Sequence, residues 1–177
     1  MNEIKAQYET NVFGLIRVTQ AVLSTMREQK SGIIVNISSI GGKMAMPLSS
    51  PYIGTKFAVE GLSESISYDL EPFGIKVVII EPGAIKTNFD TGMVVAQKNQ
   101  NPSSPYYKGM QKLQSSLNSL LKNGTPPAKV AEVILNAITT PNPNLRYTVG
   151  DDAALLAQKR KELSDSEFQK LVLEFFK

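Results

Sequence analysis

Two side chains in the first half of the sequence have the types and the spacing that proton transfer needs. Tyr52 and Lys56 stand four residues apart, so on a helix they share one face and their polar ends can meet. An ammonium near a phenol favours the phenolate and lowers a pKa that starts at about 10. Such a pair can act as general acid and base. The same spacing also fits an exposed lysine packed along a tyrosine ring, and taken alone it does not separate the two.

Other polar or turn-forming residues lie where a ligand would meet this pair. Ser39 follows the apolar run 33–37, and parallel sheets bind ligands outside the carboxyl ends of their strands. Asn11 lies inside a helical pattern, where asparagine is a poor choice by propensity. Pro82-Gly83 ends the next apolar run, and Thr87 follows a short turn later. Each also has an ordinary explanation as a turn cap, a surface amide, a strand-ending turn or a helix cap.

The elements that must position these residues alternate between helix and strand. The strand-like runs are apolar on both faces, as buried parallel strands are. Alternation with amphipathic helices predicts an α/β fold, with a parallel sheet and right-handed crossovers. The first element is a helix with no strand before it, so the pattern resembles the second half of a doubly wound domain. The expected helices cover 3–28, 50–72 and a segment from 125, the expected strands 33–37, 75–80 and 145–149, and a helical tail 151–176.

Composition excludes several kinds of chemistry. The 177 residues allow one domain and include no His and no Cys, which removes imidazole and thiolate catalysis and leaves no metal site to expect. A net charge of +3 with scattered basic residues does not favour nucleic acid. The longest apolar runs are strand-sized, so no membrane span is expected, and the N-terminus does not have the pattern of a signal peptide. A cytoplasmic protein is the expectation.

Four motifs occur in the order and at the spacing of one family. The motifs are Asn11-Val12-Phe13-Gly14, Asn36-Ile37-Ser38-Ser39-x-Gly-Gly, Tyr52-x-x-x-Lys56 and Pro82-Gly83-Ala84-Ile85-Lys86-Thr87. On these motifs, residues 3–150 resemble the short-chain dehydrogenase/reductase family. The fold of that family is a Rossmann-type parallel sheet, of which this chain would hold about three strands with flanking helices.

The resemblance implies a role for each matching residue. Tyr52 would be the general acid and base of an oxidoreductase that interconverts a ketone or aldehyde and an alcohol. Lys56 would lower the pKa of Tyr52 and bind the nicotinamide ribose, and Ser39 would hold and polarise the substrate oxygen. Asn11 would distort its helix and hold a water that relays protons. The cofactor would be NAD or NADP, with its nicotinamide contacted by Tyr52, Lys56, Pro82, Gly83, Ile85 and Thr87.

The chain also departs from the family pattern. Members begin with a strand and a Thr-Gly-x-x-x-Gly-x-Gly turn that holds the cofactor diphosphate, and the 12 glycines here do not have that spacing. About 80 to 110 residues, the first mononucleotide-binding half, would precede Met1 in a typical member. The chain is therefore predicted to be a single incomplete domain, 1–177. It would consist of a catalytic core at 3–90, a substrate lid at 91–122, and a C-terminal helix, strand and tail at 123–177.

Three functions of different kinds remain open at this stage. The first is an oxidoreductase that is active only with its missing half. The second is a non-catalytic fragment or interaction module derived from such an enzyme. The third is a hydrolase that uses Ser39 and Lys56, although the sequence has no evident oxyanion-hole motif.

The substrate and the assembly can be predicted more coarsely. The lid segment leads through Tyr106-Tyr107 into a leucine-bearing helix, and 44–47 adds apolar surface just past Ser39. Neither place has an arginine or a lysine cluster that would bind an anion. A small, neutral, apolar carbonyl compound or alcohol is expected, and the sequence 146–153 resembles steroid- and retinol-type members. The resemblance also implies a homodimer or tetramer through the helices at 3–28 and 50–72.

Overall fold

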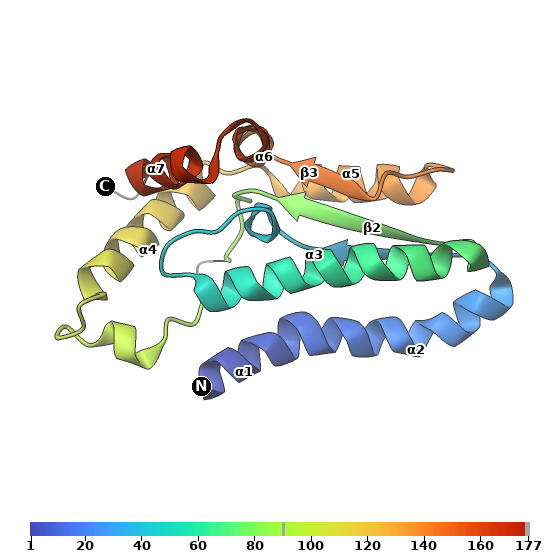
Figure 1. Ribbon diagram of the computed structural model, residues 1–177, viewed down its shortest axis with the longest axis horizontal. Helices are drawn as coiled ribbons and strands as arrows, with labels where there is room; N and C mark the ends of the chain where they lie inside the picture. The colour runs from blue at the N-terminus through green and yellow to red at the C-terminus, as the bar shows by residue number, and fades with distance from the viewer. Residues whose placement is uncertain (90, 176–177) are drawn as a thin grey trace.

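The computed structural model describes residues 1–89 and 91–175, and its elements follow the predicted alternation (Figure 1). The long first helix consists of α1 (Asn2–Tyr8), a π-helical turn (Glu9–Phe13) and α2 (Gly14–Gln29). The remaining helices and strands are β1 (Gly32–Ile37), α3 (Ser50–Leu70), β2 (Ile75–Pro82), α4 (Tyr107–Lys122), α5 (Pro127–Thr139), β3 (Arg146–Val149), α6 (Asp151–Glu162) and α7 (Asp165–Phe175). No helix in these described ranges is long and apolar enough to cross a membrane.

The three strands form one parallel sheet in the order β1-β2-β3. Gly32 pairs with Ile75 at one end of the first ladder, and Pro82 pairs with Val149 at the end of the second. The predicted α/β class and the three parallel strands are therefore confirmed. The middle strand, β2, has a neighbour on each side, and its residues Val78, Ile79 and Ile80 are completely buried.

Helices cover both faces of this sheet, as in a doubly wound fold. Successive side chains of a strand point to opposite faces, so Val77 and Val78 enter different cores. Val77 packs in a cluster with Leu70 of α3, to which α2 adds partly buried side chains. Val78 packs with Ala137 of α5 on the other face. Figure 1 shows α2 and α3 below the sheet and α5 on its other side.

The second long helix places its first turns at the carboxyl ends of the strands. Helix α3 has Pro51 in its first turn, where the missing N–H costs nothing. It ends at Leu70, and a short 3-10 turn leads to Gly74, whose φ of 68° is left-handed. The start of α3, the ends of the strands, α4 and α7 all lie at one end of the molecule (Figure 1). Tyr52 and Lys56 belong to this start.

An ionic cluster joins α3 to the sheet. The Nε atom of Arg146 in β3 lies 2.9 Å from Glu60 Oε2 and 3.4 Å from Glu81 Oε1, and its Nη2 lies 2.7 Å from Glu64 Oε2. Glu60 and Glu81 are only 5% and 3% exposed. Burial, followed by the nearby charge of Glu60, raises the pKa of Glu81, and a hydrogen bond from Thr148 opposes that rise. Arg146 is therefore the main cation that compensates two buried acids.

Replacing Arg146 tests this compensation. Arg146→Met is expected to lower the free energy of unfolding by about 2–3 kcal/mol, less than the cost of breaking a fully buried pair because part of the Arg146 side chain is exposed. Urea denaturation at neutral pH measures the change. The control is Arg17→Met, which removes an exposed pair with Glu9 and should cause no measurable loss. An equal effect of the two substitutions would contradict the role given to Arg146.

Candidate active site

Ser39 and Tyr52 meet at the end of β1. The Ser39 backbone is extended, and its hydroxyl accepts a hydrogen bond of 3.0 Å from Gly41 N, which caps the short 3-10 turn Ile40–Gly42. Hydrogen bonding to the same side chain lowers the pKa of the Tyr52 phenol. Ser39 thus caps a turn close to Tyr52, and its part in holding a substrate oxygen stays a prediction.

Lys56 lies one turn further along α3, on the same side as Tyr52. Its Nζ donates a hydrogen bond of 3.0 Å to the carbonyl oxygen of Ile37 and lies 5.8 Å from the centre of the Tyr52 ring. The side chain is partly buried. Lys56 is therefore held between the end of β1 and the tyrosine, and the ammonium group keeps two further hydrogens for other acceptors.

Burial shifts the pKa values of both members of this pair. Burial raises the pKa of Tyr52 above its ordinary value, and the hydrogen bond with Ser39 opposes this effect without cancelling it. Burial lowers the pKa of Lys56, against which the negative charge of Glu60 acts. In the Tyr52 pKa, loss of water around the phenolate outweighs the hydrogen bond with Ser39, and the role implied for Lys56 stays a prediction.

Asn11 lies where the first helix departs from α geometry. The π-helical turn Glu9–Phe13 contains it, so the distortion that the resemblance implies is present. Its Nδ2 donates a hydrogen bond of 3.1 Å to Thr55 Oγ1, and that hydroxyl donates one of 2.7 Å to the Tyr52 carbonyl oxygen. Thr55 is fully buried. Asn11 is thereby tied to the helix that carries Tyr52 and Lys56, while its part in a proton relay stays a prediction.

The segment from Pro82 to Thr87 leaves the end of β2 beside the C-terminal half of the chain. Pro82 and Gly83 are partly exposed, and Ile85 forms an isolated β-bridge with Thr125. The Thr87 hydroxyl donates only a long hydrogen bond of 3.4 Å, to Ile85 O, and the residue is exposed. Four of the six predicted cofactor-binding residues therefore lie together, at the end of β2 and on the loop that follows it.

Two residues that the sequence reasoning missed also belong to this region. Phe89, which is half-exposed, meets Tyr52 edge to face with ring centres 6.2 Å apart and an interplanar angle of 62°. Asp152, at the start of α6, accepts a hydrogen bond of 2.7 Å from Ala84 N. For Phe89 the sequence offered a general indication, because it is an apolar residue shortly after the motif that ends the strand. None pointed to Asp152, whose partner is 68 residues away in the sequence.

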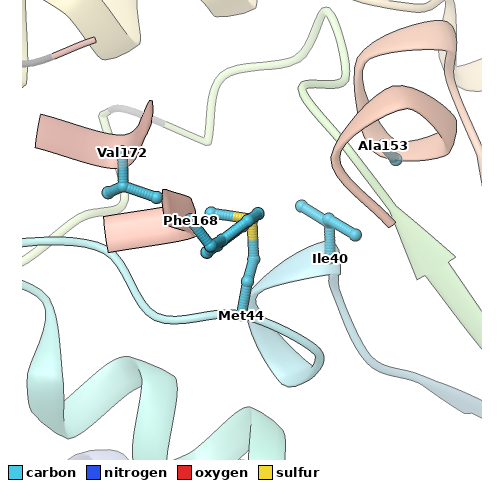
Figure 2. Packing of buried hydrophobic residues seen from close by; sticks show 5 residues of the cluster. All are labelled: Ile40, Met44, Ala153, Phe168 and Val172. Atoms are coloured by element: carbon cyan, nitrogen blue, oxygen red, sulfur yellow. The ribbon is translucent and has the colours of Figure 1, made fainter. Parts of the chain in front are cut away.

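The loop that follows Ser39 is covered by the C-terminal helices. Figure 2 shows Ile40 and Met44 next to Ala153 of α6 and to Phe168 and Val172 of α7. Met44 is only 4% exposed. The expectation that this methionine adds free apolar surface beside the reacting oxygen is therefore wrong, because its side chain fills a core beneath α7.

The predicted lid lies over the same end of the molecule. Residues 91–106 contain a short 3-10 turn at Gln97–Gln100 and lead into α4, which buries Met110, Leu113 and Leu121. A Cβ added to Gly109 of α4 would lie 3.1 Å from Leu48 Cδ1, so this helix rests on the loop before α3. The position agrees with a lid, and its role in binding substrate stays a prediction.

Comparison with known proteins places the chain in a family. A family model described as short chain dehydrogenase matches residues 1–98, more than half of the chain. The chain belongs to the short-chain dehydrogenase family. An uncharacterised oxidoreductase of Schizosaccharomyces pombe is 42% identical over 161 residues, which are 91% of this chain and 66% of that protein. The 3-ketodihydrosphingosine reductase of Bacteroides thetaiotaomicron is 32% identical over 98% of this chain and 64% of its own length.

Solved structures of the family have the same fold. A short-chain dehydrogenase from Streptomyces avermitilis superposes with a TM-score of 0.75 and 36% identity, over 96% of this chain and 60% of that one. A short chain dehydrogenase from Burkholderia cenocepacia, solved in complex with NADP, superposes with a TM-score of 0.69 and 18% identity, over 98% and 59%. The chain thus spans about two thirds or less of the length of these relatives.

The hydrogen bond between Ser39 and Tyr52 can be tested by titration. Ser39→Ala is expected to raise the pKa of Tyr52 further, because the bond with Ser39 lowers it. Ultraviolet difference titration against Tyr52→Phe isolates this phenol from the other five tyrosines. Ser39→Thr keeps a hydroxyl and is the control. A Tyr52 pKa that stays the same or falls in Ser39→Ala would show that the bond has no such effect.

Proposed function

We propose that the protein is an NAD- or NADP-dependent oxidoreductase that interconverts a ketone or aldehyde and an alcohol, with Tyr52 as the general acid and base. The observation that carries this proposal is the convergence of Tyr52, Ser39 and Lys56 at the carboxyl end of β1. The motif resemblance supports the cofactor class. Proteins of the same fold were solved in complex with NADP or with NAD, which agrees with it.

The residues at the site fit the nicotinamide end of such a cofactor. Lys56 Nζ donates one hydrogen bond to Ile37 O and has two further hydrogens that can bind ribose hydroxyls. The Thr87 side chain is exposed beside the turn that follows β2. The sequence has no glycine-rich turn for a diphosphate. We therefore propose that residues outside this chain hold the rest of the cofactor, and that activity requires them.

The chain's own residues handle the proton and the orientation of the substrate. In the reductive direction the Tyr52 phenol donates its proton to the carbonyl oxygen, while the Ser39 hydroxyl holds that oxygen by a hydrogen bond. The bound dinucleotide supplies the hydride, or accepts it in the reverse direction. Burial raises the pKa of Tyr52, which favours the protonated phenol that this step uses.

The other two functions considered are less well supported. A Ser-Lys hydrolase needs a lysine that accepts the serine proton, whereas Ser39 is engaged with Gly41 and Tyr52, and Lys56 donates to Ile37. A non-catalytic interaction module is favoured by one observation, an open groove of about 610 Å³ between α2 and β1 with mainly apolar lining. The same groove also fits an oxidoreductase in which residues outside this chain pack against α2 and β1. Titration of the natural full-length protein with NADH and NADPH distinguishes the oxidoreductase from the interaction module.

The predicted substrate is a neutral, largely apolar carbonyl compound. The aromatic ring of Phe89 lies beside the Tyr52 ring, and the residue is half-exposed. Its exposed surface offers apolar contact close to the phenol. Among the relatives are a 3-ketodihydrosphingosine reductase and the human 17-beta-hydroxysteroid dehydrogenase type 1, the latter 34% identical over 78% of this chain and 43% of its own length. Their names agree with this substrate class.

Association into a homodimer or tetramer also stays a proposal. The two long helical segments expose several large apolar side chains, as a protein contact would need. Those of α2 and α3 that are most exposed are Val18 and Tyr68, each 67% exposed. Sedimentation of the natural full-length protein measures the assembly, and a monomer at tens of micromolar would count against it.

Removal of the Tyr52 hydroxyl tests the catalytic assignment. In the full-length protein Tyr52→Phe is expected to reduce kcat at least 100-fold, the low end of the usual contribution of a general acid, while the Kd of the dinucleotide stays nearly the same. Steady-state kinetics and fluorescence titration measure the two quantities. Tyr68→Phe, on an exposed face of the same helix, is the control and should keep full activity. A Tyr52→Phe variant with more than a tenth of the activity would rule out Tyr52 as the acid.

A substrate panel tests the apolar class and the contribution of Phe89. We expect the full-length protein to prefer aryl and long-chain ketones over keto acids and anionic sugars by tenfold or more. Phe89→Ala should reduce kcat/KM for the apolar ketones about fivefold, because a half-exposed ring can add about 1 kcal/mol on full burial. Phe57→Ala removes a ring of matching exposure on the outside of α3 and should change nothing. A tenfold preference for the anionic compounds would overturn the substrate class.

A further inference from the structure

The first turn of α6 touches both loops of the candidate active site. Asp152 and Ala153 are neighbours in the sequence, but they contact different segments. Asp152 meets the turn that follows β2, on the proposed nicotinamide side. Ala153 packs against the turn that follows β1 and Ser39. One helical turn is thus in contact with both sides of the site.

The contact of Asp152 with the turn after β2 is close and specific. Its Oδ2 accepts a hydrogen bond of 2.7 Å from Ala84 N. A Cβ added to Gly83 would overlap the Asp152 carboxylate, so this glycine is required by a protein side chain and not only by a ligand. Gly150, with a φ of 106°, has the same constraint, because a Cβ there would lie 2.6 Å from Asp152 Oδ1. The carboxylate therefore fits between two glycines.

The rest of this turn is also fastened to the C-terminal half of the chain. Gly83 N donates a hydrogen bond of 2.9 Å to Val149 O, at the end of β3. Thr125 N donates one of 2.9 Å to Ala84 O, and Lys86 N donates one of 2.9 Å to Thr125 O. Among these bonds, only the one to Ala84 N comes from a side chain, so it can be removed without changing the backbone.

The contact of Ala153 with the turn after Ser39 is apolar. Ala153 is completely buried and shares a cluster with Ile40 and Met44, whose positions beside it are visible in Figure 2. Phe168 of α7 closes this cluster from the other side. Because tightly packed interiors deform little, the start of α6 fixes the place of the turn that Ser39 caps.

We propose that the start of α6 is a clamp that sets the distance between the proton-transfer residues and the cofactor-binding turn, with Asp152 as its positioning residue. The proposal rests on the oxidoreductase function given above. Asp152 acts through Ala84 N and Gly83, which it holds in place, and it does not take part in proton transfer. Its negative charge in the first turn of α6 also suits the positive end of the helix dipole.

Substitutions at Asp152 and at its neighbour separate the hydrogen bond from the charge. Asp152→Asn keeps an oxygen that can accept from Ala84 N, whereas Asp152→Ala leaves that N–H without its partner. Asp151→Ala removes an acidic residue from the same first turn, where the side chain is exposed, and is the matched control. Thermal unfolding of each variant shows whether the fold is kept.

Two measurements on the natural full-length protein test the clamp. Hydrogen exchange at the Ala84 amide should accelerate about tenfold in Asp152→Ala and stay within about threefold of the unsubstituted protein in Asp152→Asn and Asp151→Ala. The Kd and KM for NADH or NADPH, whichever binds, should rise about tenfold in Asp152→Ala and stay close to normal in the other two.

Each outcome has a definite meaning. If Asp152→Ala leaves the exchange rate unchanged, or speeds it while leaving Kd and KM unchanged, the clamp is wrong and the oxidoreductase function stands. Equal losses in Asp152→Asn and Asp152→Ala would also overturn it, because the retained acceptor should rescue binding. Absence of dinucleotide binding in the unsubstituted protein would instead refute the proposed function, and the clamp for a cofactor would fall with it.

Discussion

The central strand β2 has to find hydrogen-bond partners along both edges and apolar neighbours on both faces, and the arrangement of the chain follows from this. A buried peptide group without a partner costs about as much as a lost hydrogen bond, so β1 and β3 must lie alongside it. Helices α3 and α5 remove its two faces from water. Beyond Pro82, where β2 ends, the chain leaves the sheet. It continues as a loop whose backbone N–H groups donate to other segments. The candidate site occupies that transition.

Charge at the same end of the sheet connects stability with the state of the site. Glu81 is the one acidic residue of β2, and it lies near Arg146, Lys43 and Glu60 of α3. Burial lowers the pKa of Lys56, and the negative charge of Glu60, one turn further along the helix, opposes that shift. The acid that helps to hold α3 on β3 therefore also favours the charged form of the lysine. A change in this cluster would therefore act both on the fold and on the proton transfer proposed for the site, and the two effects have to be measured separately.

Much of the fold could be predicted from the sequence because its periodicities are strong. The β-branched residues of 33–37 favour a buried strand, and the spacing of Tyr52 and Lys56 on a helix puts them on one face. The pKa direction of Tyr52 could not be predicted, because it depends on how much water the folded chain excludes. Asp152 was missed because its partner is remote in sequence, and the surface expected from Met44 is covered by a helix that lies more than a hundred residues later. Local sequence patterns predict helices, strands and pairs of side chains on one helix face. They do not predict which segment, distant in the sequence, packs over these residues.

The π-helical turn at Glu9–Phe13 separates what the fold needs from what the site needs. Such a turn spans one residue more than an α-helical turn, so it behaves as an insertion whose effect is confined to a few positions. A chain shortened by one residue there would still form a continuous helix, and Val12 and the residues after it could keep their packing. The bond from Asn11 to Thr55 would not survive that shortening, because it depends on where the wider turn places the amide. We expect length variation at this point to change the contact between Asn11 and Thr55 more than the helix itself, and natural sequences of different length here would test that expectation.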